Sequence, residues 1–255
     1  MTARQQRTVQ SVERVLDVLE IMAEAGGELS LSDIATTSGL PLPTIHRLVQ
    51  TLVNRGYVRQ QPSRRYALGP RLVNLGEAAN GMIRSTALPH LSRLVDTFGE
   101  TSNVAMLDGD RATYVAQVPS THPMRMFTEV GGRVPLHSTA VGKALLAQLS
   151  DGKARVLLGR TGMPAQTEHT VIDIDVMLRE LAKIRDRGYA VDEGEQEIGV
   201  NCLAVAVPSG ATRTAISISG PAARMTHDLI SRAASPLIAT ADALSADLVD
   251  ERPSA

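Results

Sequence analysis

Three short amphipathic segments, separated by glycine and proline, dominate the first part of this 255-residue chain. Apolar residues recur at helical spacing in Val9–Ala25 and again in Thr44–Arg55, and a glycine follows each segment. Between them, the Ser30-Leu-Ser-Asp33 capping pattern predicts a short second helix that Gly39 ends. The turn between the second and third predicted helices is short and contains glycine, as a helix-turn-helix requires.

Two strand-like segments follow the third predicted helix. They are Tyr57–Gln61 and Tyr66–Leu68, and the turn Pro62-Ser-Arg-Arg65 joins them. Three helices followed by a basic hairpin are typical of a winged helix-turn-helix, whose third helix enters the major groove of duplex DNA. A helical bundle whose hairpin contacts another protein is the alternative interpretation of the same pattern.

Charges are unevenly distributed along the chain, although its formal net charge is only −1. Residues 1–70 carry eight arginines and six acidic residues, whereas residues 71–255 carry 18 basic and 21 acidic residues. No acidic residue lies between Asp33 and Glu77, and this interval of 43 residues contains six arginines. An acid-free, arginine-rich interval is typical of a surface that contacts a polyanion such as DNA.

The exposed face of the third predicted helix carries side chains that can reach base edges or phosphates. The two arginines of the following turn suit contact with phosphates or with the minor groove. The predicted DNA-binding residues are therefore Thr44, His46, Arg47, Gln50, Thr51, Asn54, Arg64 and Arg65.

The rest of the chain alternates strand-like and helical segments, with hairpins rather than strict strand–helix–strand repeats. This order of strand-like and helical segments predicts an α+β fold. Predicted strands are Asn103–Leu107, Ala112–Val118, Met124–Glu129, Tyr189–Asp192, Cys202–Val207 and Thr214–Ser219. Predicted helices are Pro70–Ile83, Arg84–Phe98, Gly142–Gln148, Asp151–Leu158, Asp173–Arg187 and Thr226–Leu248.

No catalytic constellation stands out in this second part. The Gly142-Lys143 dipeptide lacks the pattern of a phosphate-binding loop, so Gly142 is interpreted as a close-packing residue and Lys143 as a solvated one. The acidic residues at 192, 193, 195 and 197 fit either paired carboxylates or, for most of them, a solvated loop. The six histidines lack metal-ligand spacing. A binding domain without catalytic residues, metal or cofactor is therefore expected.

The amino-acid composition restricts which classes of binding partner the chain can have. Aromatic residues make up 2 % of the chain and tryptophan is absent, which argues against platforms that stack single-stranded bases. The single cysteine, Cys202, excludes an internal disulfide, and its apolar surroundings in sequence favour a core residue. The polar start and the lack of an apolar run of about 18 residues predict a cytoplasmic protein without a membrane partner.

Several ordered motifs resemble the IclR family of transcriptional regulators over nearly the whole chain. The stretch Gln117–Leu149 resembles most closely the subgroup that contains the glyoxylate-bypass and allantoin regulators. The motifs in the first part are Ser11–Arg14, Leu40–Leu48, Leu52–Tyr57 and Arg65–Gly69. Those in the second part are Met124–Met126, Gly132–His137, Val141–Leu146, Arg185–Tyr189, Gly199–Cys202 and Ile216–Pro221.

The resemblance implies a winged helix-turn-helix joined by a linker helix to a GAF-like α/β effector-binding domain. The expected boundaries are 1–69, 70–83 and 84–255. Family members form dimers or tetramers and bind operator DNA, and many bind small carboxylates or aromatic acids. The implied effector-binding residues are Met126, Val134, Ala140, Val141, Asp192, Val200, Cys202, Ser217 and Ser219, with Pro123 beside them.

This implied set is coherent in physical terms. Ser217 and Ser219 lie on one face of a strand, and the N–H groups of Ala140 and Val141 at a helix start suit a carboxylate. Asp192 would repel a carboxylate unless it is protonated or accepts from a hydroxyl or amide of the ligand. A small oxo acid such as glyoxylate or pyruvate, or a ureide such as allantoin or allantoate, is therefore expected.

Two departures from the subgroup's pattern bear on the effector. The subgroup usually has Gly-Ala where this chain has Ala140-Val141, and the added methyl groups narrow the pocket or restrict the loop. Gly194 stands where a further acidic residue is common. A repressor is the expected function; an activator, or a small-molecule enzyme that uses Asp192 and Cys202, is the alternative.

Overall fold

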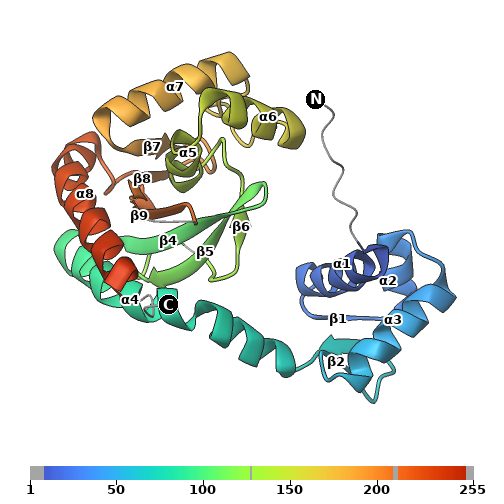
Figure 1. Cartoon of the computed structure of the whole chain (residues 1–255). Coiled ribbons are helices and arrows are strands. Elements are labelled where there is room, and N and C mark those ends of the chain that lie inside the picture. Colours follow the sequence, from blue (N-terminus) through green and yellow to red (C-terminus); the bar gives the residue numbers. More distant parts are fainter. Residues whose placement is uncertain (1–8, 127, 209–211, 251–255) are drawn as a thin grey trace. The chain divides into compact units, whose positions relative to one another are not determined.

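The computed structural model describes residues 9–126, 128–208 and 212–250 of the chain. The chain folds into two compact units, Met1–Asn80 and Gly81–Ala255. This division falls inside the linker expected at residues 70–83, and each unit is described by itself below (Figure 1).

The first unit packs three helices against a small antiparallel sheet. The helices are α1 (Gln10–Glu24), α2 (Leu31–Ser38) and α3 (Leu42–Asn54). The sheet has the order β1-β3-β2, with β1 at Glu28–Leu29, β2 at Val58–Gln60 and β3 at Tyr66–Leu68. The arrangement is the predicted winged helix-turn-helix. Only β1 is not predicted, because two residues are too few to show a strand's alternation.

Local sequence signals explain how these helices begin and pack. The Ser30 hydroxyl accepts a hydrogen bond from the Asp33 N–H at 3.1 Å, and the Asp33 carboxylate accepts one from the Ser30 N–H, so the capping box is confirmed. The apolar stripes of the three helices meet in one core. Its buried members are Val18, Met22, Ile34, Ile45, Val49, Leu52, Val58 and Tyr66.

A single long helix, α4 (Arg71–Phe98), follows the first unit. The prediction of two separate helices over residues 70–83 and 84–98 is therefore wrong. Pro89 lies inside α4 but on its exposed side, where water can satisfy the carbonyl group that loses its backbone donor. Helix α4 thus runs without a break from the first unit into the second.

The second unit is built on a six-stranded antiparallel sheet with the order β6-β5-β4-β9-β8-β7. Each strand pairs with its neighbour in antiparallel register. The strands are β4 (Thr101–Asp108), β5 (Arg111–Val118), β6 (Arg133–Val134), β7 (Ala190–Glu193), β8 (Val200–Val207) and β9 (Thr214–Pro221).

Helices cover both faces of this sheet (Figure 1). One apolar cluster joins the sheet to α5 (Ala140–Ala147), α6 (Asp151–Thr161) and α7 (Ile174–Arg187). A second cluster joins the opposite face to the later part of α4 and to α8 (His227–Asp250). The second unit therefore has three layers, and both faces of the sheet are buried.

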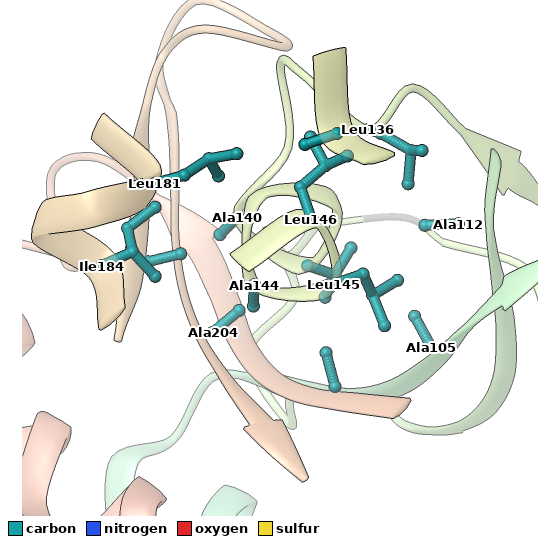
Figure 2. Packing of buried hydrophobic residues seen from close by; sticks show 14 of the residues in the cluster. Ala105, Ala112, Leu136, Ala140, Ala144, Leu145, Leu146, Leu181, Ile184 and Ala204 are labelled. Carbon is teal, nitrogen blue, oxygen red and sulfur yellow. The ribbon is translucent and has the colours of Figure 1, made fainter. Parts of the chain in front are cut away.

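Helix α5 occupies the centre of its layer. Residues 140–146 are all buried, and Figure 2 shows Leu145 and Leu146 in the same cluster as Leu136 and Ala105. Gly142 permits the close approach, because a Cβ atom there would lie 2.5 Å from the Leu136 Cα atom. This confirms the interpretation of Gly142 as a close-packing residue.

The third predicted strand of this unit, Met124–Glu129, is not formed among its described residues. Instead, side chains attach this segment to the sheet: Gln117 Nε2 donates to the Thr128 carbonyl at 3.0 Å. The short strand β6 at Arg133–Val134 takes the place beside β5. Side-chain contacts at Thr128 therefore hold the described part of this segment against the sheet as a loop.

Candidate functional site

Helix α3 presents a polar face to solvent in the first unit. His46, Arg47, Gln50, Thr51 and Asn54 are exposed and Thr44 is half-buried, while Ile45, Val49 and Leu52 fill the core on the opposite side. Gln50 Nε2 donates to Asn54 Oδ1 at 3.3 Å, which keeps both amides on the exposed face. All six residues predicted for base or phosphate contact thus come from one helix.

The hairpin between β2 and β3 places its two arginines differently. Arg64 is exposed and adopts φ +63°, the left-handed region that non-glycine residues rarely occupy. Arg65 forms an ion pair with Glu28 at 3.2 Å and donates to the Glu28 carbonyl. The structure therefore gives Arg65 an internal partner, whereas no ion pair of Arg64 is present among the described residues.

A cavity of about 440 Å³, here called the α5 cavity, opens in the second unit at the start of α5. Residues of α5, of strands β5 to β9 and of the segment before β6 line it. Eight of the nine effector residues implied by the sequence are among them: Met126, Val134, Ala140, Val141, Asp192, Val200, Cys202 and Ser217. Pro123 and Ser219 are not among its lining residues.

The first turn of α5 faces this cavity. Thr139 caps the helix, and its hydroxyl accepts a hydrogen bond from the Gly142 N–H at 3.1 Å. The N–H groups of Ala140 and Val141 have no partner within a helix, and among the described residues none is present from elsewhere. The helix start therefore offers two donors to an anion.

Asp192 is the buried charge of the α5 cavity. Its Oδ1 accepts hydrogen bonds from the backbone N–H of Glu195 at 2.7 Å and of Gln196 at 3.4 Å. Burial nevertheless raises the pKa of Asp192 to about 7, because desolvation outweighs these hydrogen bonds. Burial likewise raises the pKa of the neighbouring Cys202 thiol, so this thiol is not an activated nucleophile.

Ser219 does not line the α5 cavity but is connected to a residue that does. Its hydroxyl accepts a hydrogen bond from Asn103 Nδ2 at 3.3 Å. The Asn103 Oδ1 atom accepts in turn from the Thr128 hydroxyl at 2.9 Å, and Thr128 lines the α5 cavity. Ser219 is therefore connected to the cavity through Asn103 and Thr128.

Lys143 corrects one interpretation made from the sequence. This residue is 2 % exposed rather than solvated, and its ammonium forms an ion pair with Glu195. A solvated loop is likewise wrong for Asp192 and Glu195, although Glu193 and Glu197 are exposed. A lone lysine in a helix that is otherwise apolar on all sides is the sequence signal of a buried charge pair.

Sequence reasoning missed half of the cavity lining. Some of these residues are polar side chains of strands and loops, whose direction only the fold determines. Thr139 could have been found, because a threonine directly before an apolar helix is a strong N-cap signal. The missed lining residues are Tyr114, Thr128, Glu129, Gly132, Arg133, Thr139, Gln196 and Glu197.

The described residues contain no group of three or more histidine, cysteine, aspartate or glutamate side chains that could hold a metal ion. They also contain no helix that is both long enough and apolar enough to cross a membrane.

A winged helix-turn-helix, connected by one helix to a domain whose cavity has both polar and apolar lining residues, defines a DNA-binding regulator of the ligand-sensing class. Residues 11–62 match the IclR helix-turn-helix domain. Residues 77–246 match the C-terminal domain of the bacterial transcriptional regulator IclR. The chain therefore belongs to the IclR family of bacterial transcriptional regulators.

Individual relatives agree with this assignment. The transcriptional repressor IclR of Escherichia coli (strain K12) is 38 % identical over 229 residues, which cover 87 % of this chain and 84 % of the relative. The HTH-type transcriptional repressor AllR of Salmonella typhi is 36 % identical over 228 residues, covering 88 % and 84 %. The crystal structure of an IclR transcriptional regulator from Alicyclobacillus acidocaldarius has a TM-score of 0.84 at 28 % identity, covering 95 % of this chain and 100 % of that one.

Proposed function

We propose that this chain is a transcriptional repressor whose operator binding is controlled by a small acid or ureide in the α5 cavity. Both relatives identified above by sequence are named repressors, which supports repression over activation. We also propose that it acts as a homodimer or homotetramer, because a two-fold axis matches the two half-sites of a pseudo-palindromic operator.

One observation carries the effector assignment: donors for an anion and acceptors for a polar group line the same cavity. The N–H groups of Ala140 and Val141 suit a carboxylate or a carbonyl oxygen. Asp192 and Ser217 suit an N–H or O–H of the same ligand. A cavity of about 440 Å³ accommodates a molecule of two to five carbons without closing tightly on it.

Control of DNA binding requires that the ligand bind two arrangements of the protein with different affinity. The continuous helix α4 connects the two units, and its last turn leads through Gly99 into β4. Ser120, at the start of the segment that lines the cavity, donates from its hydroxyl to the Gly99 carbonyl. We propose this contact as part of the route from the cavity to α4.

A thermal-shift screen tests the proposed effector class. Glyoxylate, pyruvate, allantoin and allantoate are compared with 4-hydroxybenzoate, which stands for a larger aromatic acid. At least one small acid or ureide is expected to raise Tm with the logarithm of its concentration. The double variant Ser217→Ala with Ser219→Ala should lose this shift, whereas Arg47→Ala, in the other unit, should keep it. A shift by the aromatic acid alone, or no shift at all, would overturn the effector class.

A further inference from the structure

A second cavity, of about 470 Å³, lies against α7 in the same unit. It is here called the α7 cavity, and its lining shares no residue with that of the α5 cavity. Helix α7 and the edge strand β7 supply half of its lining residues, and α5, the start of α8 and the loops beside α7 and β7 supply the rest. Neither the sequence patterns nor the proposed function accounts for this cavity.

The buried ion pair of Lys143 and Glu195 lines the α7 cavity. Among the described residues, Glu195 is the only partner of the Lys143 ammonium, which has three protons to donate. The second carboxylate oxygen, Glu195 Oε2, is buried and has no hydrogen-bond partner in the described part of the chain. A buried oxygen without a donor is costly, so a group that donates a hydrogen bond to Glu195 Oε2 would be favoured here.

Helix α7 adds a row of cations to the same cavity. Arg179, Lys183 and Arg187 follow one another at intervals of four residues and therefore share one face of the helix. Glu180 pairs with Arg187 at 2.9 Å and with Lys183 at 3.8 Å. Within the described ranges, Arg179 forms no ion pair within 4 Å, although Asp175, one turn earlier on α7, interacts with it electrostatically. Arg179 is therefore the cation of this row that remains available to an anion.

The mixture of charges restricts the ligand further. Glu180, Glu193 and Glu195 face the cavity together with the cations, and His169 and His227 also line it. A plain polyanion would meet the exposed Glu193 carboxylate, whereas an apolar molecule would leave Arg179 and Glu195 Oε2 without a partner. A ligand with one anionic group and at least one hydroxyl or amine matches both kinds of group.

We propose that the α7 cavity is a second ligand site, for a small carboxylate or phosphate ester that also carries a hydroxyl or amino group. The anionic group pairs with Arg179, and the hydroxyl or amine donates to Glu195 Oε2.

A ligand in the α7 cavity would also affect ligand binding in the α5 cavity. The Glu195 N–H donates to Asp192 Oδ1 at 2.7 Å, so the backbone that carries the Glu195 carboxylate also holds Asp192. A ligand on Glu195 therefore changes the binding of an effector at Asp192, and the effector changes the binding of that ligand by the same factor. This coupling rests on the proposed function, but the second site itself does not.

Isothermal titration calorimetry of the full chain tests the site with glycerate, glycerol 3-phosphate and serine. Acetate serves as a probe that has an anionic group but no hydroxyl or amine. At least one of the first three probes is expected to bind saturably, and acetate at least tenfold more weakly. Arg179→Ala should weaken the binding at least tenfold.

Two controls locate the ligand. Arg160 is another exposed arginine, on α6, and has no ion pair among the described residues. Arg160→Ala should therefore leave the binding of the probe unchanged. Ser217→Ala alters the α5 cavity and should also leave it unchanged. The proposal is overturned if no probe binds, if acetate binds equally well, or if binding survives Arg179→Ala. Loss of binding in Ser217→Ala would place the probe in the α5 cavity instead and overturn the second site alone.

Discussion

Asp192 is buried and also accepts hydrogen bonds from backbone N–H groups, and these two properties shift its pKa in opposite directions. The hydrogen bonds from the Glu195 and Gln196 N–H groups favour the charged carboxylate, but burial disfavours it more strongly. Near neutral pH both protonation states are therefore present. The same side chain can then donate to a ligand carboxylate or accept from a ligand N–H, which suits a cavity for either an oxo acid or a ureide.

The raised pKa of Asp192 predicts how stability changes with pH. Because its pKa rises from 3.8 in the unfolded chain to about 7, the folded protein binds the proton more tightly. Its contribution to stability is fully present below about pH 4 and is lost as the pH rises through about 7. Over this pH range the shift lowers the free energy of unfolding by an amount on the order of 4 kcal/mol.

Urea unfolding of wild type and Asp192→Asn at several pH values between 4 and 8 measures this contribution. The variant cannot ionise, so its free energy of unfolding should decrease less with rising pH than that of wild type. Asp186→Asn, a change at an exposed acidic residue of α7, should follow the wild-type curve. Parallel curves for wild type and Asp192→Asn would show that the carboxyl titrates normally.

Single residues also mark where sequence reasoning reaches its limit. The family resemblance places Asp192 and Cys202 in the pocket, and their side chains do line one cavity. The expectation for Lys143 is wrong because its partner, Glu195, is 52 residues further along the chain. A periodic pattern reports on local structure, whereas an ion pair of this kind depends on how α5 and the loop after β7 meet in the fold.

At the scale of elements, α5 depends on a small residue. Gly142 brings the helix against the backbone of Leu136, and this approach also places Ala140 and Val141 at the α5 cavity. A larger residue at 142 would move the helix start away from the backbone of Leu136. The ligand donors and the core packing of α5 are therefore linked.

Gly142→Ala tests that link. The added Cβ would lie 2.5 Å from the Leu136 Cα and carbonyl oxygen, so the variant should lose about 1–3 kcal/mol of stability through overpacking. Gly159→Ala, in helix α6 where a Cβ meets nothing within 4 Å, should instead gain about 1 kcal/mol. Thermal or urea unfolding compares the two. Equal stability of both variants would contradict the close approach of α5.

Most elements could be predicted from the sequence, because amphipathic periods are strong along α1, α3 and α7, and side-chain caps begin α2 and α7. The failures have physical causes. The strand β1 is two residues long, Pro89 does not interrupt α4, and the described residues between 124 and 129 form no strand. Tertiary contacts determine each of these three features, and a local sequence pattern does not predict them.

At the scale of the whole molecule, the chain connects a DNA-binding unit with a sensing unit through α4. The near-zero net charge conceals this division, because the acidic second part offsets the arginine-rich first part. Membership of the IclR family and the α5 cavity together support one account, in which a metabolite changes the affinity for an operator.

The affinity of the protein for its own preferred duplex, measured with and without metabolite, tests this account most directly. A preferred duplex is first selected from a random-sequence pool and then titrated by fluorescence anisotropy. The account predicts a selected site with two-fold symmetry, bound at least tenfold more weakly by Arg47→Ala and normally by Arg160→Ala. It also predicts that a metabolite that stabilises the protein weakens this binding in wild type but not in Ser217→Ala with Ser219→Ala. A pool without enrichment, or an affinity that the bound metabolite leaves unchanged, would contradict it.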